Sequence, residues 1–359
     1  MSESRPDLPV AAAPTALAER LIAWQAEHGR HGLPWQQTRD PYRVWLSEIM
    51  LQQTQVGTVL GYYGRFLQRF PDVAALAAAP QDEVLTLWAG LGYYSRARNL
   101  HRCAQQVVDL FGGRFPASAA VLAGLPGIGR STAAAIAAFC FGERVAILDG
   151  NVKRVLTRAL GFAGDLAQTS QQRALWALAE AALPQGAGIE AYTQGLMDLG
   201  ATLCTTRRPR CPDCPLAGDC RALALGRPEA FPVKTRKPGR GQRAHALLWL
   251  QQGDAVWLVQ RPGQGVWAGL WALPEFDTVE ALEEATGDWP GRSQRQAVIK
   301  HQLTHFAWQL SPVRHLLPAR GDTDAELLSR WPAGRWVAAE RLPDYGLPAP
   351  IRKLLQPDF

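Results

Sequence analysis

Hydrophobic and polar positions follow one pattern in the first two thirds of the chain and another in the last third. Between Ala16 and Leu225, segments rich in Ala and Leu have a helical period and are separated by Gly and Pro, with little strand-like alternation. After Arg243 the apolar runs are short, and a Gly-Asp turn divides AHALLWLQQ from DAVWLVQR as in a hairpin. This pattern predicts a mainly α-helical domain followed by a smaller α+β domain.

Chain length and a basic segment with Pro and Gly indicate the domain boundaries. A chain of 359 residues is long enough for about two domains. Between Leu203 and Arg243, ten Lys and Arg residues stand against three acidic residues, and the later part is a basic linker with Pro and Gly. We expect an N-terminal tail over 1–15, a helical domain over 16–225, the linker over 226–243 and the α+β domain over 244–359.

Composition narrows the class of protein. Hydrophobic residues make up 47% of the chain and charged residues 19%, which suits two buried cores and not a disordered chain. The formal net charge of +6 is compatible with a polyanionic partner. No apolar run approaches the roughly 20 residues of a membrane span, and the first residues lack the basic-then-apolar order of a signal peptide. We therefore expect a cytoplasmic protein without a membrane partner.

The cysteines fall into two groups. Cys103 and Cys140 stand alone in apolar helical surroundings and are expected in the core. The other four have the spacing Cys204-x6-Cys211-x2-Cys214-x5-Cys220, so that one loop can surround a single metal centre. Four thiolates suit structural zinc and a [4Fe-4S] cluster alike, although zinc sites usually pair two Cys-x2-Cys knuckles and only one occurs here. Four unligated thiols are the remaining alternative.

A glycine turn and a later aspartate both precede predicted helices. Gly127 and Gly129 lie in LPGIGRST, where a tight turn exposes the first amides of the next helix to an anion such as a DNA phosphate. An ordinary turn between helices is the alternative. Asp149 follows the apolar run Val145 to Leu148, and it is either a simple N-cap or a carboxylate that faces a cationic sugar.

A glutamate lies on an amphipathic segment that runs on from Val44. Its core stripe is expected to consist of Leu46, Ile49, Met50, Val56 and Leu60. The other side carries Glu48, Gln52 and Gln55 together with Val44, Leu51 and Val59. A carboxylate among apolar groups suits a cleft, where burial raises its pKa as a general acid requires. A solvated polar face is the alternative.

Adjacent aromatic and basic residues occupy GLGYYSRARN. Tyr93 follows a glycine turn and is suited to wedge into a base stack, with Arg96 and Arg98 directed toward phosphate. Core packing with solvated arginines is the alternative.

In this order the motifs resemble the endonuclease III superfamily of DNA glycosylases, and most closely the MutY-type adenine glycosylases. The motifs are LPW from Leu33, SEIMLQQTQV from Ser47, GLGYYSRARNLH from Gly90, LPGIGRSTA from Leu125, ILDGNVKR from Ile147, YTQGLMDLGATLC from Tyr192, and the four-cysteine loop. The resemblance covers nearly the whole chain. In this family the x6, x2, x5 cysteine loop holds a [4Fe-4S] cluster, which the resemblance therefore implies here.

The resemblance also implies a reaction, in which adenine paired with 8-oxoguanine is flipped out and its N-glycosidic bond is hydrolysed. Glu48 would protonate adenine N7 and then help to activate water, while Asp149 would stay ionised beside the positive sugar. Asn151 would orient Asp149, and Ser131 would lie near the acid. Because lyases of the superfamily carry a lysine where this chain has Ser131, we expect an essentially monofunctional enzyme, with only weak strand cleavage through an amine such as Lys153.

Double-stranded DNA with A:8-oxoguanine or A:G mispairs is the partner that the resemblance implies, bound by a monomer associated with the nucleoid. The residues expected to contact DNA are Gln52, Gln53, Tyr93, Arg96, Gly127, Gly129, Lys153, Thr304 and His305. The hairpin carbonyls would also suit a monovalent cation.

The last domain resembles the Nudix-like domain with which such glycosylases find 8-oxoguanine. Its segment VEALEEATG lacks the metal-binding box of a Nudix hydrolase, so we expect no pyrophosphatase activity. The lesion-reading loop, usually with a Phe-Ser-His core, reads His301-Gln302-Leu303-Thr304-His305 here. Thr304 keeps a hydroxyl, whereas Leu303 lacks the aromatic ring.

Two other functions remain alternatives from the sequence. An oxidised-pyrimidine glycosylase/lyase would be trapped on DNA by borohydride, which the absence of a lysine at position 131 argues against. A non-catalytic DNA-binding or redox-sensing cluster protein would bind mispairs without base release.

Overall fold

The computed structural model describes residues 14–235, 239, 241–303, 305–318 and 324–355. They form two compact units, one containing residues 14–55 and 103–235 and the other residues 56–102 together with the described residues from 239 to 355. The predicted tail falls mostly outside the described residues, although positions 14 and 15 already belong to the first helix. No helix of the described chain combines the length and apolar character needed to cross a bilayer.

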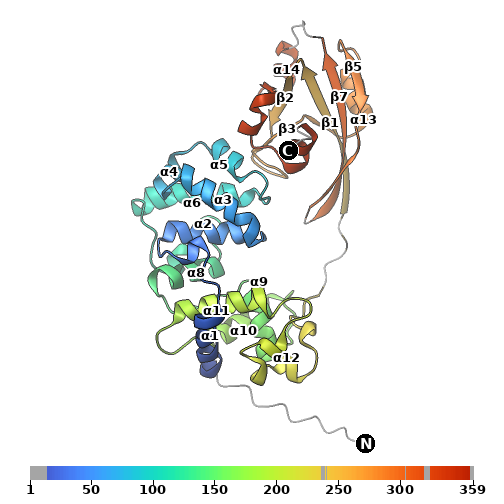
Figure 1. The fold of residues 1–359 in the computed structure, drawn as a ribbon. Helices are drawn as coiled ribbons and strands as arrows, with labels where there is room; N and C mark the ends of the chain where they lie inside the picture. The colour runs from blue at the N-terminus through green and yellow to red at the C-terminus, as the bar shows by residue number, and fades with distance from the viewer. Residues whose placement is uncertain (1–13, 236–238, 240, 304, 319–323, 356–359) are drawn as a thin grey trace, which may run out of the picture. The chain divides into compact units, whose positions relative to one another are not determined.

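Helices build the first unit (Figure 1). They are α1 (Pro14–His28), α2 (Pro41–Leu51), α7 (Ala119–Leu122), α8 (Arg130–Phe141), α9 (Gly150–Leu160), α10 (Thr169–Ala181), α11 (Ile189–Thr202) and α12 (Arg221–Ala224), with short 3-10 turns η1 (Pro34–Gln36), η2 (Cys211–Asp213), η3 (Ala217–Asp219) and η4 (Pro228–Ala230). Asp40 is the N-cap of α2, and Pro41 is the first residue of the helix, where proline is favoured. Left-handed Gly142 and Gly161 end α8 and α9.

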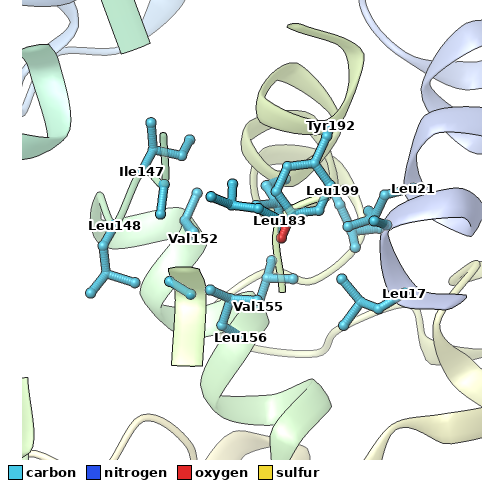
Figure 2. Close-up of a cluster of buried hydrophobic side chains, with 14 of the residues drawn as sticks. Leu17, Leu21, Ile147, Leu148, Val152, Val155, Leu156, Leu183, Tyr192 and Leu199 are labelled. Atoms are coloured by element: carbon cyan, nitrogen blue, oxygen red, sulfur yellow. The ribbon is translucent and has the colours of Figure 1, made fainter. Parts of the chain in front are cut away.

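Apolar residues of α9 face the core of the first unit (Figure 2). Val152, Val155 and Leu156 recur at the helical i, i+3, i+4 spacing and are fully buried. They pack with side chains of α1 and α11 and with the extended segment that leads into α9. The N-terminus of α9, where Asp149 lies, is therefore held against this core.

The second unit combines helices with a mixed sheet (Figure 1). Its helices are α3 (Val56–Arg69), α4 (Val73–Ala78), α5 (Gln81–Trp88), the start of α6 (Ser95–Phe111), α13 (Val279–Thr286), α14 (Asp324–Arg330), α15 (Ala349–Leu355) and the 3-10 turn η5 (Ala339–Asp344). The indole of Trp271 donates to the Asp82 carboxylate at 3.0 Å, and Arg98 donates to the Ala268 carbonyl at 2.8 Å. These bonds join the helical segment to the C-terminal part within this unit.

A long parallel pair, β1 (Gly241–Gln252) and β7 (Phe306–Leu317), forms the centre of the sheet. The strand order is β3-β2-β1-β7-β5, with β4 added to β1, β6 to β7 and β8 to β2. The bounds of the others are β2 (Ala255–Gln260), β3 (Trp271–Ala272), β4 (Glu275–Phe276), β5 (Arg292–Arg295), β6 (Ile299–Gln302) and β8 (Arg335–Ala338). Alternate residues of β1, Ala246, Leu248 and Leu250, enter one core with α13, and β1 and β2 form the predicted hairpin.

Two predictions from the apolar pattern are wrong in detail. The predicted helix around Glu48 is broken, because α2 ends at Leu51 and α3 begins at Val56. The break changes the phase of the stripe, so that Leu60 is 40% exposed and Val59 is fully buried. Cys103 is buried as predicted, whereas Cys140 is only half-buried.

Candidate active site

Glu48 lies on α2, which packs against α8 in the first unit. The adjacent Ser47 and Ile49 are buried, and Glu48 itself is half-buried. Burial raises the pKa of Glu48 from 4.5 to about 8, and the negative charge of Asp149 adds to this shift. Glu48 therefore carries a proton at neutral pH, the form in which a carboxyl group can act as a general acid.

This raised pKa has a cost in stability, which Glu48→Gln should remove. Because the folded protein holds the proton and the unfolded chain releases it, the free energy of unfolding falls as pH rises from about 4.5 to about 8. Glutamine is neutral throughout, so we expect the variant to be more stable by roughly 1 to 3 kcal/mol at about pH 8 and unchanged near pH 4. Urea unfolding at several pH values measures this difference, and a difference independent of pH would contradict it.

Asp149 is the N-cap of α9, and its carboxylate accepts a hydrogen bond from the Val152 amide at 2.7 Å. Burial raises the pKa of Asp149, whereas the amides of Val152 and Asn151 and the charges of Arg154 and Lys153 act in the opposite direction. Glu48 has no such set of opposing groups acting on its pKa. The two carboxyl groups therefore interact electrostatically, and of the pair Asp149 is the one with amides and cations that favour its ionised form.

A network behind Asp149 fixes Asn151. Arg154 donates to the Asn151 side-chain oxygen at 2.8 Å, to the Gly200 carbonyl at 2.7 Å and to the Cys204 carbonyl at 2.7 Å. Arg154 was not among the residues predicted for the site, although its i, i+3 spacing from Asn151 indicates that the two side chains share one face of α9. The network joins the start of α9 to the end of α11 and to the first cysteine.

Gly200 lets α9 and α11 approach closely, because a Cβ at this position would lie 2.7 Å from the Asn151 Cβ. Gly200→Ala should therefore shift Asn151 and lower the rate of base release about tenfold. Gly186→Ala is the matched control, since a Cβ there meets nothing within 4 Å. Single-turnover rates of the two variants test this, and equal rates would show that the close approach has no part in the reaction.

The first turn of α8 completes the site. The Ser131 hydroxyl accepts a hydrogen bond from the Leu148 amide at 3.0 Å, which holds the residue before Asp149 against α8. The Gln52 amide donates to the Thr132 hydroxyl at 3.4 Å and is half-buried. The segments that carry Ser131, Gln52, Glu48 and Asp149 thus pack together, and Thr132 joins them as a residue that was not predicted from the sequence.

The glycine hairpin lies directly before α8. Gly127 has a φ of +77°, and both Gly127 and Gly129 are exposed. Ile128 between them is buried and its amide bonds to the Leu125 carbonyl at 3.1 Å. The turn is therefore anchored from inside, while its glycines present backbone to the outside.

Three exposed residues of the described chain other than glycine have strained backbone, Gln53, Tyr93 and Arg208. Gln53, directly after Gln52, is exposed with a φ of +58°. In the second unit, Tyr93 is 45% exposed with a φ of +50°. Positive φ is uncommon for residues other than glycine, and such strain often occurs at functional sites.

Arg96 differs in placement from the expectation that it faces phosphate. It is buried and donates to the carbonyls of Leu91 and Gly92 at 3.3 and 3.1 Å. The glycine turn leaves these carbonyls without helical partners, and Arg96 satisfies them from within. Of the other expected DNA contacts, Lys153 is half-buried, His305 is exposed, and Thr304 lies outside the described residues.

The four clustered cysteines are half-buried and line one small cavity together with Arg158. Arg158 donates to the Cys204 sulfur at 3.4 Å, and burial raises the pKa of Cys214 to about 12. Among the described residues, no three His, Cys, Asp or Glu side chains are arranged to hold a single metal ion. The donor set itself, four cysteine sulfurs in one loop beside Arg158, is that of an iron-sulfur or zinc site.

Comparison with known proteins agrees with this architecture. Residues 46–180 match the HhH-GPD superfamily base excision DNA repair protein family, and residues 245–357 match the NUDIX domain family. An adenine DNA glycosylase of Buchnera aphidicola subsp. Schizaphis graminum (strain Sg) is 32% identical over 344 residues, which cover 94% of this chain and 97% of that one. The chain belongs to the adenine DNA glycosylase family. The human adenine DNA glycosylase is 34% identical over 409 residues, covering 95% of this chain and 74% of its own.

A solved structure supports the glycosylase fold of the helical part of the chain. A thermostable thymine-DNA glycosylase is similar with a TM-score of 0.52 and 30% identity, over 58% of this chain and 95% of that chain. The predicted fold class, a helical glycosylase domain followed by a Nudix-like domain with a mixed sheet, is confirmed. The roles of individual site residues stay predictions.

Proposed function

We propose that this protein is a base excision repair enzyme that removes adenine from double-stranded DNA, where the adenine is paired with 8-oxoguanine or guanine. The observation that carries the proposal is the half-buried Glu48, whose pKa is raised by burial and by the charge of Asp149, the N-cap of α9. The related proteins are named adenine DNA glycosylases, which indicates that the base removed is adenine. The Nudix-like domain is the candidate for recognition of the opposite base.

In this mechanism Glu48 gives its proton to N7 of the flipped adenine. The bond between the sugar C1′ and N9 then breaks, and its electron pair leaves with the neutral base. Ionised Asp149 stabilises the positive sugar, while Asn151 and Ser131 hold the segment that carries it. Water adds to C1′, and Glu48, now a carboxylate, takes the proton of that water and is restored.

Exposed residues account for base extrusion. Gln53 and Tyr93 each present a side chain from a strained turn, which suits insertion into the base stack, and the Gly127–Gly129 hairpin suits a backbone phosphate. His305, directly before β7, is assigned to the strand opposite the adenine. Lyases of the superfamily carry a lysine at the position of Ser131 on α8, and its amine attacks the sugar. Because serine has no amine, the enzyme is essentially monofunctional.

Cys204, Cys211, Cys214 and Cys220 would hold a [4Fe-4S] cluster, which would order the loop when bound and takes no part in the steps above. The visible spectrum of the purified protein tests this assignment. A brown protein with broad visible absorbance is expected, and a colourless protein with bound zinc would overturn it.

Release of free adenine from duplexes with A:8-oxoguanine, A:G and A:T pairs tests the function under single-turnover conditions. We expect rates in the order A:8-oxoguanine, A:G and A:T, with the last as the matched control. Binding of the mispair without base release would favour a non-catalytic DNA-binding protein. Borohydride trapping comparable to that of a lyase would favour the glycosylase/lyase alternative.

A further inference from the structure

Arg130 is the first residue of α8 and directly follows the exposed glycine hairpin. Its side chain has no part in the mechanism above. The guanidinium carbon lies 3.9 Å from the centre of the Trp176 ring, and one guanidinium nitrogen pairs with the Glu180 carboxylate. Trp176 and Glu180 are one helical turn apart on α10, so one face of this helix holds Arg130 from two sides.

The two contacts act differently on the arginine. Trp176 is half-buried and packs against the core of the first unit, so its ring is a fixed surface on which the guanidinium stacks. Stacking restricts the many rotamers of a free arginine before any ligand arrives. Glu180 instead forms an ion pair with the guanidinium of Arg130. Because the two side chains are 56% and 51% exposed, the pair is solvated and contributes little to the stability of the fold.

The geometry points to Arg130 as a further ligand for a DNA phosphate beside the hairpin, positioned by Trp176 and masked by Glu180 in the free protein. A phosphate would take the guanidinium in place of the carboxylate, since arginine binds both groups with the same planar fork. Glu180 is then an internal competitor that weakens binding to any duplex. This inference rests on the proposed function only in requiring that the hairpin faces DNA.

Fluorescence anisotropy with an undamaged duplex, at several salt concentrations between about 50 and 200 mM, tests the inference without turnover. Arg130→Ala should weaken binding about tenfold and reduce the slope of log K against log salt by about 0.9, the value for one lost phosphate contact. Glu180→Gln should tighten binding about three- to tenfold. Trp176→Leu should weaken binding with the slope unchanged, because the charge remains but is no longer held in place.

Glu27→Gln is the matched control for charge, because Glu27 on α1 is exposed and pairs only weakly with His28, at 3.7 Å. The decisive variant is Arg130→Ala combined with Glu180→Gln. If Glu180 acts through Arg130, adding Glu180→Gln to Arg130→Ala should change DNA affinity no more than Glu27→Gln changes that of the wild type. Thermal unfolding of each variant confirms that the fold is intact.

The outcomes separate this inference from the proposed function. An unchanged salt slope in Arg130→Ala would overturn the inference. So would a gain in affinity from Glu180→Gln that is just as large when Arg130 has already been replaced by Ala. In either case Arg130 and Glu180 form a structural ion pair only. A wild-type protein that fails to bind duplex DNA would instead overturn the proposed function.

Discussion

Asp149→Asn should reduce the single-turnover rate of adenine release at least about a thousandfold while leaving the mispaired duplex bound. Asparagine keeps an oxygen that can accept from the Val152 amide, so the cap of α9 and the fold are preserved. It lacks the negative charge that stabilises the positive sugar. Glu48→Gln should cause a loss of similar size for a different reason, because the amide keeps the shape of the side chain but has no proton to give to the base.

Release of labelled adenine measures the rate, and anisotropy with the same duplex measures binding. Glu27→Gln on α1 is the control, because it makes the same kind of change at an exposed site of the first unit. Full activity in either pocket variant would refute the assigned chemistry. Loss of binding together with activity would show that the variant damages the DNA surface and not the chemical step.

The second large effect is expected at Arg158 on α9, whose side chain supports the cysteine loop. Arg158 is 2% exposed and donates to the carbonyls of Thr205, Thr206 and Phe231 at 2.7, 3.2 and 3.2 Å. Arg158→Met would leave these carbonyls without their donor, which should lower the free energy of unfolding by about 3 to 5 kcal/mol. If the loop holds the proposed cluster, we also expect the variant to lose its visible absorbance.

Urea unfolding and the visible spectrum measure both effects. Arg173→Met on α10 is the matched control, because Arg173 is exposed. If the free energy of unfolding of Arg158→Met lies within about 1 kcal/mol of that of the control, and the variant keeps its visible absorbance, the loop does not depend on this arginine.

Local signals in the sequence predicted the framework of the site well. The Asp149 cap, the glycine turn before α8 and the hairpin between β1 and β2 each depend on residues that are neighbours along the chain, and the structure contains all three. The apolar neighbours of Glu48 predicted a raised pKa for this group, and burial does raise it. Burial also raises the pKa of Asp149, which the sequence did not predict.

Long-range contacts explain what the sequence could not predict. No Gly or Pro marks the break between Leu51 and Val56, where Gln53 takes a left-handed conformation. Arg96 was interpreted as a surface charge because its partners, two carbonyls of the preceding turn, are visible only in three dimensions.

The segment expected to be a linker shows the same limit. Its basic, Pro- and Gly-bearing composition gave no sign that Thr235 bonds to Asp165, or that the Val233 carbonyl accepts from the Leu166 amide. Both bonds lie within the first unit, so residues up to Thr235 are held by it.

The pH dependence of single-turnover adenine release from an A:8-oxoguanine duplex tests most directly whether two differently protonated carboxyl groups carry the reaction. Base release requires Glu48 with its proton, and the pKa of Glu48 is raised to about 8. The rate should therefore fall about tenfold per pH unit above about pH 8, and this limb should be absent from the residual activity of Glu48→Gln. A wild-type rate that stays constant from about pH 7 to 10 would contradict the account, because Glu48 could not then be the acid.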